Sequence, residues 1–237
     1  MNQNFLITGA SSGLGKEFAL KIATIAKNIV IVGRSKNKLN QLKKKIKKLN
    51  PIVNIIIIIT DLSNEAGVNA LFRKFKKQNK IKFIEVLVNS AANFTPNKIE
   101  KISMKQLKKD FCLNVFAPFM ISRYFGIKMK KRKKGIIFNI GSSSSYDCSK
   151  ETSVYCSTKH ALLGMSRAFN AEWKTGGVKS IFIAPGSMKT PMGKKVKFQN
   201  FNTFIDPVEV ADLMKNFLKK QKSIFIDEVK IKRINYK

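Results

Sequence analysis

The chain has 237 residues, 44% of them hydrophobic, which is enough to bury the core of one α/β domain. No apolar run reaches the length of a membrane span, and no charged segment followed by an apolar one marks a secretion signal. Three cysteines without a spacing pattern (Cys112, Cys148 and Cys156) do not indicate a disulfide framework. We therefore expect a protein of the reducing cytoplasm, folded as a single domain over residues 1–237.

The charge is extreme, because 46 lysines and arginines stand against 14 acidic residues, a formal net charge of +32. One interpretation is a polyanionic partner such as nucleic acid, a membrane surface or an acidic carrier protein. The other is compositional drift. The basic residues are nearly all lysine, isoleucine and asparagine are also frequent, and no aromatic residues alternate with the dispersed lysine runs. We favour drift and do not expect nucleic-acid binding.

Apolar runs of strand length alternate with segments of helical pattern along the whole chain. The predicted strands are 4–8, 28–32, 52–59, 83–88, 135–140, 179–183 and 224–229, and the predicted helices are 14–26, 36–49, 64–79, 99–129, 155–174 and 207–220. This alternation predicts an α/β fold, a doubly wound, Rossmann-like parallel sheet of about seven strands with helices on both faces. Ligands of such sheets bind beyond the carboxyl ends of the strands, where Gly9, Arg34, Asp61, Asn89 and Ser142 fall.

The first predicted turn is rich in glycine, with Gly9, Gly13 and Gly15 between a short apolar strand and a helical segment. Glycines permit a tight turn and close approach of the backbone to a pyrophosphate, and the following helix start offers N–H groups. The spacing G-x-x-x-G-x-G differs from the common G-x-G-x-x-G, and a glycine-rich turn without a ligand is the alternative. We predict a dinucleotide-binding turn.

The end of the second predicted strand distinguishes the two nicotinamide cofactors. An acid there would bind the ribose 2′-hydroxyl of NAD(H), but Gly33 stands in its place. Arg34 can hold a 2′-phosphate by a bidentate contact, and Ser11 and Ser12 can add donors. We predict NADP(H), with NAD(H) as the alternative. The other interpretation of Arg34 is an ordinary surface arginine.

Tyr155 and Lys159 are four residues apart in a predicted helix, so they lie on the same face of it. A cation beside a phenol lowers the pKa of the phenol, and a tyrosine with a lowered pKa can exchange protons with an alcohol near neutral pH. The pair taken alone is common by chance. Beside the glycine-rich turn, it predicts an active site.

Together these motifs resemble those of the short-chain dehydrogenase/reductase family, in its classical branch. The matching segments are Thr8–Gly15, Asp61-Leu62, Asn89-Ser90-Ala91-Ala92 in place of the family's N-N-A-G, and Pro185-Gly186-Ser187-Met188-Lys189-Thr190. The family's four catalytic positions match Asn114, Ser142, Tyr155 and Lys159. The matches run in order from residue 4 to about 226, which is nearly the whole chain.

The resemblance implies an oxidoreductase that interconverts a carbonyl and a secondary alcohol by hydride transfer. Tyr155 would act as general acid/base, Lys159 would lower its pKa and bind the nicotinamide ribose, Ser142 would orient the carbonyl, and Asn114 would place a relay water. The implied cofactor-binding residues are Gly9, Ser11, Ser12, Gly13, Leu14, Gly15, Arg34, Asp61, Leu62, Asn89, Ala91, Tyr155, Lys159, Pro185, Gly186, Met188 and Thr190. The substrate is unspecified: a 3-oxoacyl group on a carrier protein, or a small carbonyl or sugar metabolite.

Alternatives and departures accompany this interpretation. A non-catalytic NADP(H)-binding sensor or scaffold is the alternative function, and the intact catalytic set speaks against it. No metal site is expected, because His160 is the only histidine and no ligand cluster has metal spacing. The last predicted strand lacks the family's glycine-rich segment, and the lid region from Pro191 to Phe204 is short and basic, with Lys194, Lys195 and Lys197.

Two predicted helices, 111–129 and 155–173, carry apolar residues on more than one face. A helix that is apolar all round is covered on both sides, and the resemblance also implies dimers or tetramers built on these helices. We therefore expect a homo-oligomer with two-fold symmetry. The residues in question are Phe111, Val115, Phe119 and Phe125 in the first helix and Ala161, Met165, Phe169 and Trp173 in the second.

Overall fold

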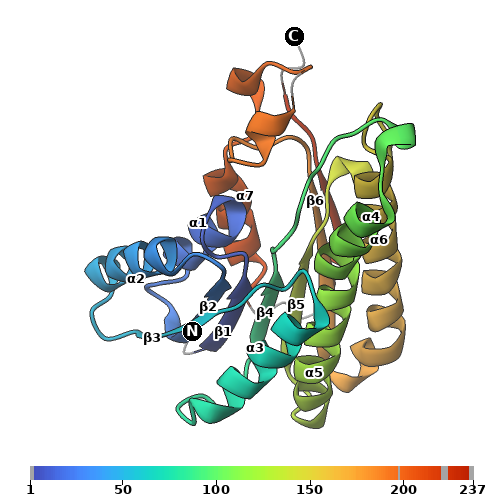
Figure 1. The fold of residues 1–237 in the computed structure, drawn as a ribbon. Coiled ribbons are helices and arrows are strands. Elements are labelled where there is room, and N and C mark those ends of the chain that lie inside the picture. The colour runs from blue at the N-terminus through green and yellow to red at the C-terminus, as the bar shows by residue number, and fades with distance from the viewer. Residues whose placement is uncertain (1–2, 197, 220–223, 235–237) are drawn as a thin grey trace.

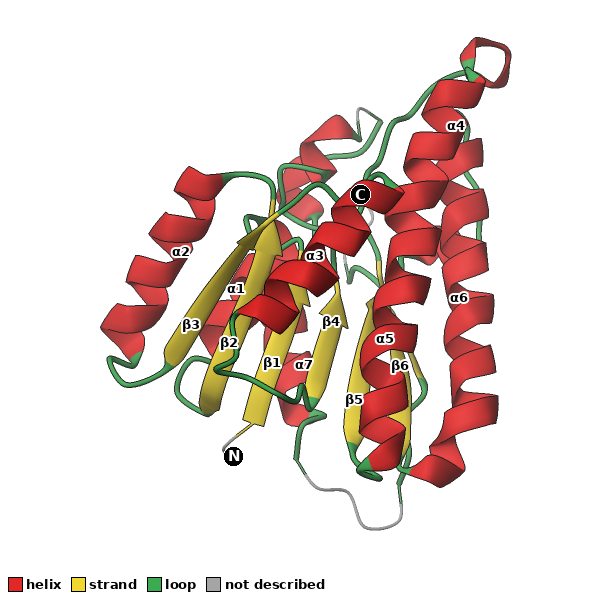
Figure 2. Cartoon of the chain, turned by 60° about the horizontal axis from the view of Figure 1, so that its bottom comes forward, coloured by secondary structure: helices red, strands yellow, loops and turns green. Residues whose placement is uncertain are grey.

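The computed structural model describes residues 3–196, 198–219 and 224–234. Within these residues, seven strands form one parallel sheet in the order β3-β2-β1-β4-β5-β6-β7 (Figure 2). The strands are β1 (Gln3–Thr8), β2 (Ala26–Gly33), β3 (Asn54–Ile59), β4 (Val86–Asn89), β5 (Gly135–Ile140), β6 (Val178–Pro185) and β7 (Glu228–Ile231). The strand order reverses between β1 and β4, which confirms the predicted doubly wound, Rossmann-like fold and places a ligand crevice at their carboxyl ends.

Helices cover both faces of the sheet (Figure 1). The helices are α1 (Gly13–Lys21), α2 (Lys36–Leu49), α3 (Glu65–Lys77), α4 (Met104–Phe111), α5 (Ala117–Lys131), α6 (Ser153–Trp173) and α7 (Pro207–Asn216). Alternate residues of each strand point to opposite faces, so Phe5 and Ile7 of β1 join the core under α1, α2 and α7, while Leu6 joins the core under α3, α5 and α6. Both faces are therefore apolar, as expected for a parallel sheet.

The amino ends of three neighbouring strands are joined by a ladder of asparagines. Asn28 of β2 donates from Nδ2 to Asn4 Oδ1 at 2.6 Å, and Asn54 of β3 donates to Asn28 Oδ1 at 2.9 Å. Asn4 donates in turn to the carbonyl of Phe83 at 3.0 Å. The strand register brings the three residues side by side, and each amide satisfies the next.

The predicted single helix over 99–129 is wrong. The structure divides this stretch into a 3₁₀ turn (Ile99–Lys101), α4, a π-helical segment (Cys112–Phe116) and α5. Ser103 accepts a hydrogen bond from Gln106 N and so begins α4, and the π-helical segment contains Asn114. A π-helical turn inserted into an α-helix is often found at functional sites, because it re-aims the residues it contains.

Other boundaries shift by a few residues. The predicted helix 14–26 ends at Lys21, since the chain turns there and β2 begins at Ala26. The last strand was predicted at 224–229, but its ladder to β6 runs over Glu228–Ile231. The helix predicted at 207–220 ends at Asn216, and residue 220 lies outside the described residues. None of the helices in the described residues has the length and apolar character to cross a membrane.

One side of α5 and α6 packs into the core of this subunit, as predicted, and it holds four of the eight apolar residues named for these helices. Phe125, Met165, Phe169 and Trp173 are buried inside this subunit, and the Phe169 ring stacks on Trp173 with centroids 4.5 Å apart. These four side chains are thus satisfied by the chain's own core. The exposed apolar residues of α5 and the segment before it form a stripe at helical spacing, made of Phe116, Phe119, Met120 and Ile127.

Candidate active site

The glycine turn between β1 and α1 lies directly against the turn after β4. Gly9 has φ +67° and Gly13 has φ +54°, conformations that other residues rarely adopt. A Cβ on Gly9 would meet Ala91 N at 2.7 Å. The Thr8 hydroxyl accepts hydrogen bonds from Ser90 N and Ala91 N, both at 3.1 Å, and joins the two turns. The glycines are therefore required to form a bare backbone cradle on the cleft.

The start of α1 is open. Among the described residues, the Ser12 side chain makes no capping hydrogen bond, and the first turn of α1 holds no acidic residue. In contrast, Ser35, Asn64 and Asp206 each accept a backbone N–H at the starts of α2, α3 and α7. The α1 start thus keeps N–H groups and the positive end of its dipole for an anion, so the cradle fits the pyrophosphate of a dinucleotide.

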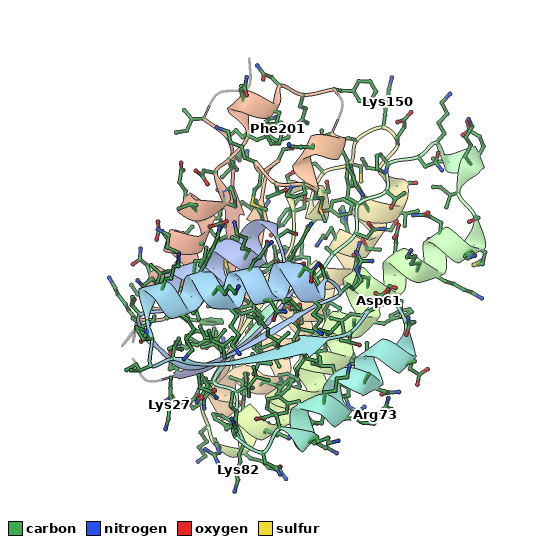
Figure 3. The ribbon with its side chains drawn as sticks, turned by 60° about the vertical axis from the view of Figure 1, so that its left-hand side comes forward. Lys27, Asp61, Arg73, Lys82, Lys150 and Phe201 are labelled. Carbon is green, nitrogen blue, oxygen red and sulfur yellow. The ribbon has the colours of Figure 1, made fainter. Side chains whose placement is uncertain are left out.

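Arg34 and Asp61 lie at the far end of the same cleft. Arg34 follows β2 and is exposed, and its Nη1 lies 4.0 Å from Asp61 Oδ2. An exposed ion pair at this separation contributes little to stability, so the Arg34 guanidinium remains available for a phosphate. Asp61 also accepts Ser63 N at 3.0 Å, which fixes the turn after β3, and the adjoining Leu62 lines the cleft beside Gly33. Figure 3 shows Asp61 near the start of α3.

Tyr155 and Lys159 stand on α6, one turn apart, and both line the cleft. Tyr155 is within hydrogen-bonding reach of the Ser142 side chain, and the Phe94 ring packs edge-on against it with centroids 4.9 Å apart. Lys159 is buried, donates to the carbonyl of Ile140 at 2.8 Å, and has its Nζ 5.5 Å from the centre of the Tyr155 ring. Cleft, phenol and amine therefore share one small volume.

The electrostatics of this pair differ from the expectation. Burial raises the pKa of Tyr155 to about 12, the Ser142 hydrogen bond lowers it, and the neighbouring Cys156 raises it. Burial also lowers the pKa of Lys159 to about 7. The predicted depression of the Tyr155 pKa by Lys159 is not seen: desolvation of the phenol is the largest influence, and Ser142 is the neighbour that favours the phenolate.

Asn114 is buried in the π-helical segment and bonded on all sides. Its Oδ1 accepts Asn93 N at 2.8 Å, and its Nδ2 donates to the Asn93 carbonyl at 3.0 Å and to Thr158 Oγ1 at 3.1 Å. Thr158 in turn donates to the carbonyl of Tyr155 at 2.8 Å. Asn114 therefore ties the loop after β4 to the turn of α6 that carries Tyr155.

Asn89 is turned away from the cleft. Its Nδ2 donates to Ser122 Oγ and Asn139 Oδ1, both at 2.8 Å, and its Oδ1 is buried without a partner among the described residues. Asn89 thus braces β4 against β5 and α5, and Ala91 lines the cleft two residues later. Sequence position alone could not tell these two arrangements apart.

The segment after β6 closes the near end of the cleft. Met188 and Thr190 line it, as do Pro191 and Met192, which the sequence placed in the lid region but not among the cofactor-binding residues. Pro185 ends β6, and Gly186 N donates to the carbonyl of Ile231 at 2.9 Å. Pro185 and Gly186 thus fix where the segment after β6 begins.

The contact between Lys195 and Phe94 was not predicted. Lys195 donates from Nζ to the carbonyl of Phe94 at 3.1 Å and so joins the lid region to the wall beside Tyr155. The basic lid was visible in the sequence, but its partner was not, because the two residues are separated by a hundred others. Lys197, also predicted in the lid, lies outside the described residues.

Comparison with known proteins agrees with the family resemblance of the sequence motifs. Residues 3–200 match the family model described as short chain dehydrogenase. The chain is 28% identical over 229 residues to an uncharacterised oxidoreductase of Staphylococcus haemolyticus, covering 97% of this chain and 96% of that protein. It is 30% identical over 202 residues to a very-long-chain 3-oxoacyl-coA reductase of Caenorhabditis briggsae, covering 84% of this chain and 63% of that protein.

Solved structures share the fold. An alcohol dehydrogenase from the archaeon Thermococcus sibiricus, complexed with 5-hydroxy-NADP, superposes with a TM-score of 0.87 at 21% identity, covering 100% of this chain and 98% of that one. A short-chain dehydrogenase from Sphingobium yanoikuyae, in complex with NADPH, gives 0.83 at 21% identity, covering 97% and 87%. At these identities the likeness shows the common architecture.

Proposed function

The chain belongs to the short-chain dehydrogenase family, and on that basis we propose that it is an NADP(H)-dependent oxidoreductase that interconverts a carbonyl group and a secondary alcohol. The observation that carries the proposal is Tyr155, within hydrogen-bonding reach of Ser142 and one helical turn from Lys159, on the same cleft as the open glycine cradle. A non-catalytic NADP(H) sensor would not need this group of side chains.

The residues of the cradle would hold the cofactor. The backbone of the turn from Gly9 to Gly15 and the open start of α1 would take the pyrophosphate, and Arg34 the 2′-phosphate. Asp61 and Leu62 line the cleft near Arg34 and would contact the adenine, and Met188 and Thr190, which also line it, would contact the nicotinamide. When bound, the cofactor supplies or accepts the hydride.

The side chains of α6 and the β5–α6 turn would then handle the proton. With a pKa raised to about 12, Tyr155 carries its proton at neutral pH and can donate it to a carbonyl oxygen. Ser142 would hydrogen-bond the same oxygen and orient it. With a pKa lowered to about 7, Lys159 can give up a proton near neutrality and so help restore that of Tyr155, with Asn114 fixing the surrounding loop.

The substrate class is the next step of the proposal. The Caenorhabditis briggsae relative is named as a very-long-chain 3-oxoacyl-coA reductase, which supports 3-oxoacyl thioesters, on coenzyme A or a carrier protein, as the first candidates. Small carbonyl and sugar metabolites are the comparison set. The test is NADPH oxidation by the purified protein against both sets, with NADH in parallel. No oxidation above the Tyr155→Phe background with any compound would refute the function.

We further propose a homodimer or homotetramer in which a second subunit covers the exposed stripe of α5. Phe116, Phe119 and Ile127 are each 44–55% exposed, at positions i, i+3 and i+11 of one helical face. Phe169→Glu would not test this, since Phe169 is buried against Trp173. Phe119→Glu is the better variant. Light scattering should show an oligomer for the wild type and a smaller species for the variant, and a monomeric wild type would refute the assembly.

A further inference from the structure

Glu228, the first residue of β7, is the meeting point of three elements that are distant in sequence. Its carboxylate accepts a hydrogen bond from the Tyr146 hydroxyl at 2.8 Å. Arg167 of α6 donates to both oxygens of the same carboxylate, from Nε at 2.5 Å and from Nη2 at 3.1 Å. Fork-shaped contacts of this kind fix direction as well as distance. Glu228 therefore joins the edge strand to α6 and to the β5–α6 turn.

Tyr146 ends the short 3₁₀ turn that Ser142 begins. Ser142 caps this turn, because its hydroxyl accepts from Ser144 N and its own N–H donates to Ser145 Oγ, both at 3.2 Å. At the other end, Tyr146 N donates to the carbonyl of Ser143 at 3.0 Å. These hydrogen bonds link the five residues of the turn, so a contact that holds Tyr146 also restrains Ser142.

The surroundings of Tyr146 hold its side chain in one place. Its ring packs edge-on against Phe182 with centroids 6.4 Å apart, and Lys230 Nζ lies over the ring, 3.6 Å from its centre. Arg167 lowers the pKa of Glu228, so the carboxylate stays charged, and burial and the bond to Glu228 raise the pKa of Tyr146, so the phenol keeps its proton. Asp227 is the other acid that acts on this group, and it also raises the Tyr146 pKa.

We propose that Tyr146 and Glu228 are positioning residues that hold Ser142 against Tyr155, an inference that rests on the proposed function. Neither residue is among those that line the cofactor cleft, so their influence passes through the turn. As an ordinary, partly exposed ion pair, Glu228–Arg167 would contribute little to stability. We infer that the pair matters through its location, since the turn that Glu228 holds carries Ser142, whose hydroxyl would orient the substrate carbonyl.

The test compares Tyr146→Phe with wild type and with Asp212→Asn. Tyr146→Phe removes one hydroxyl and keeps the ring. Asp212→Asn breaks a different surface pair, Lys21–Asp212 at 2.8 Å, which touches neither the turn nor the cleft. For Tyr146→Phe we expect kcat about tenfold lower with the NADPH KM nearly unchanged, because orientation is lost and cofactor binding is not. For Asp212→Asn we expect both constants unchanged.

Two readouts separate positioning from general loosening. The Ser142 hydrogen bond lowers the Tyr155 pKa, so in Tyr146→Phe the pH for half-maximal alcohol oxidation should move upward. Backbone hydrogen exchange of residues 143–147 should be about tenfold faster, with the rest of the protein unchanged. Tyr146→Phe combined with Glu228→Gln should be no worse than Tyr146→Phe alone, because both break the same link.

The outcomes are distinct. Wild-type kcat and pH profile in Tyr146→Phe, or an equal loss in Asp212→Asn, would overturn the inference. A wild type that reduces no carbonyl compound would refute the proposed function instead. Hydrogen exchange then decides the positioning alone: faster exchange in the turn of Tyr146→Phe supports it, and unchanged exchange overturns it.

Discussion

The two ends of the sheet use polar side chains in opposite ways. At the amino ends of the strands, the side chains of Asn54, Asn28 and Asn4 form a chain of hydrogen bonds that ends on the Phe83 carbonyl. At the carboxyl ends, α1 starts without a cap, and Tyr155 and Lys159 have pKa values displaced by burial in directions that disfavour their charged forms. The first end is arranged for stability, and the second keeps groups that cost stability and are open to ligands.

The largest effect should come from the phenol of Tyr155. We expect Tyr155→Phe to lower turnover by at least about 10²-fold while NADPH binding is nearly intact, because only the proton donor is lost. Steady-state kinetics and a cofactor titration measure the two quantities. Near-normal turnover of this variant would show that Tyr155 is not the proton donor. The carboxyl ends of the strands would then not differ from the amino ends by an active tyrosine.

The contrast sharpens with Lys159→Met, which should abolish efficient turnover yet stabilise the fold. Burial lowers the pKa of Lys159 from 10.5 to about 7, so the unfolded chain binds more protons than the folded one between these values. The penalty is complete below pH 7 and disappears as pH rises toward 10.5. The two pKa values correspond to about 5 kcal/mol, so we expect the variant to be more stable by up to about 5 kcal/mol at pH 6 and by less than about 1 kcal/mol at pH 10.

Urea unfolding at several pH values measures this difference, with Lys27→Met, a change at the other end of the molecule, as the control (Figure 3). A Lys159→Met variant that is less stable than the wild type at pH 6 would show that burial of this lysine at the carboxyl ends of the strands does not destabilise the fold.

At the amino ends of the strands, Asn28→Ala should lower stability and leave catalysis unchanged. It removes the middle of the ladder and leaves the oxygen of Asn4 and the amide of Asn54 without their bonds. We expect a loss of about 1–2 kcal/mol in the free energy of unfolding, with kcat and cofactor binding unchanged. An altered kcat would mean that the two ends are coupled through the strands.

The smallest effect should be on cofactor choice. Arg34→Asp places a second acid beside Asp61, and we expect the ratio of NADPH to NADH affinity to fall about tenfold, since an acid repels the 2′-phosphate and suits a free ribose hydroxyl. The measurement is a pair of dissociation constants for each protein, with Arg34→Gln as the uncharged control. A wild type that binds NADH more tightly than NADPH would contradict the assignment.

The sequence predicted the architecture, because strand and helix patterns are local. Several predicted site residues line one cleft, whereas Asn114 and Ser142 are not among its lining residues. Gly9, Arg34, Asp61, Tyr155 and Lys159 each follow a predicted strand or share a helix face, and the structure brings them to one cleft. Hydrophobic periodicity and turn residues are sufficient to place residues at this cleft, since the carboxyl ends of parallel strands lie at the same edge of the sheet.

What the sequence could not predict depends on contacts between distant residues. The π-helical segment around Asn114 reflects bonds to Asn93 and Thr158, which helical periodicity does not encode. The raised pKa of Tyr155 follows from burial, which a motif cannot measure. The link from Tyr146 to Glu228 spans 82 positions, and neither residue stands in a recognisable pattern.

The missing cap of α1 has a thermodynamic consequence. A helix without its N-cap is weaker by about 1 kcal/mol, and an anion bound at the same N–H groups would restore that contribution. The first turn of α1 should therefore open more readily than its last turn in the free protein and become protected when NADPH is added. The cofactor would then be part of the fold of its own binding helix, and cellular NADPH would set how much of the chain is fully folded.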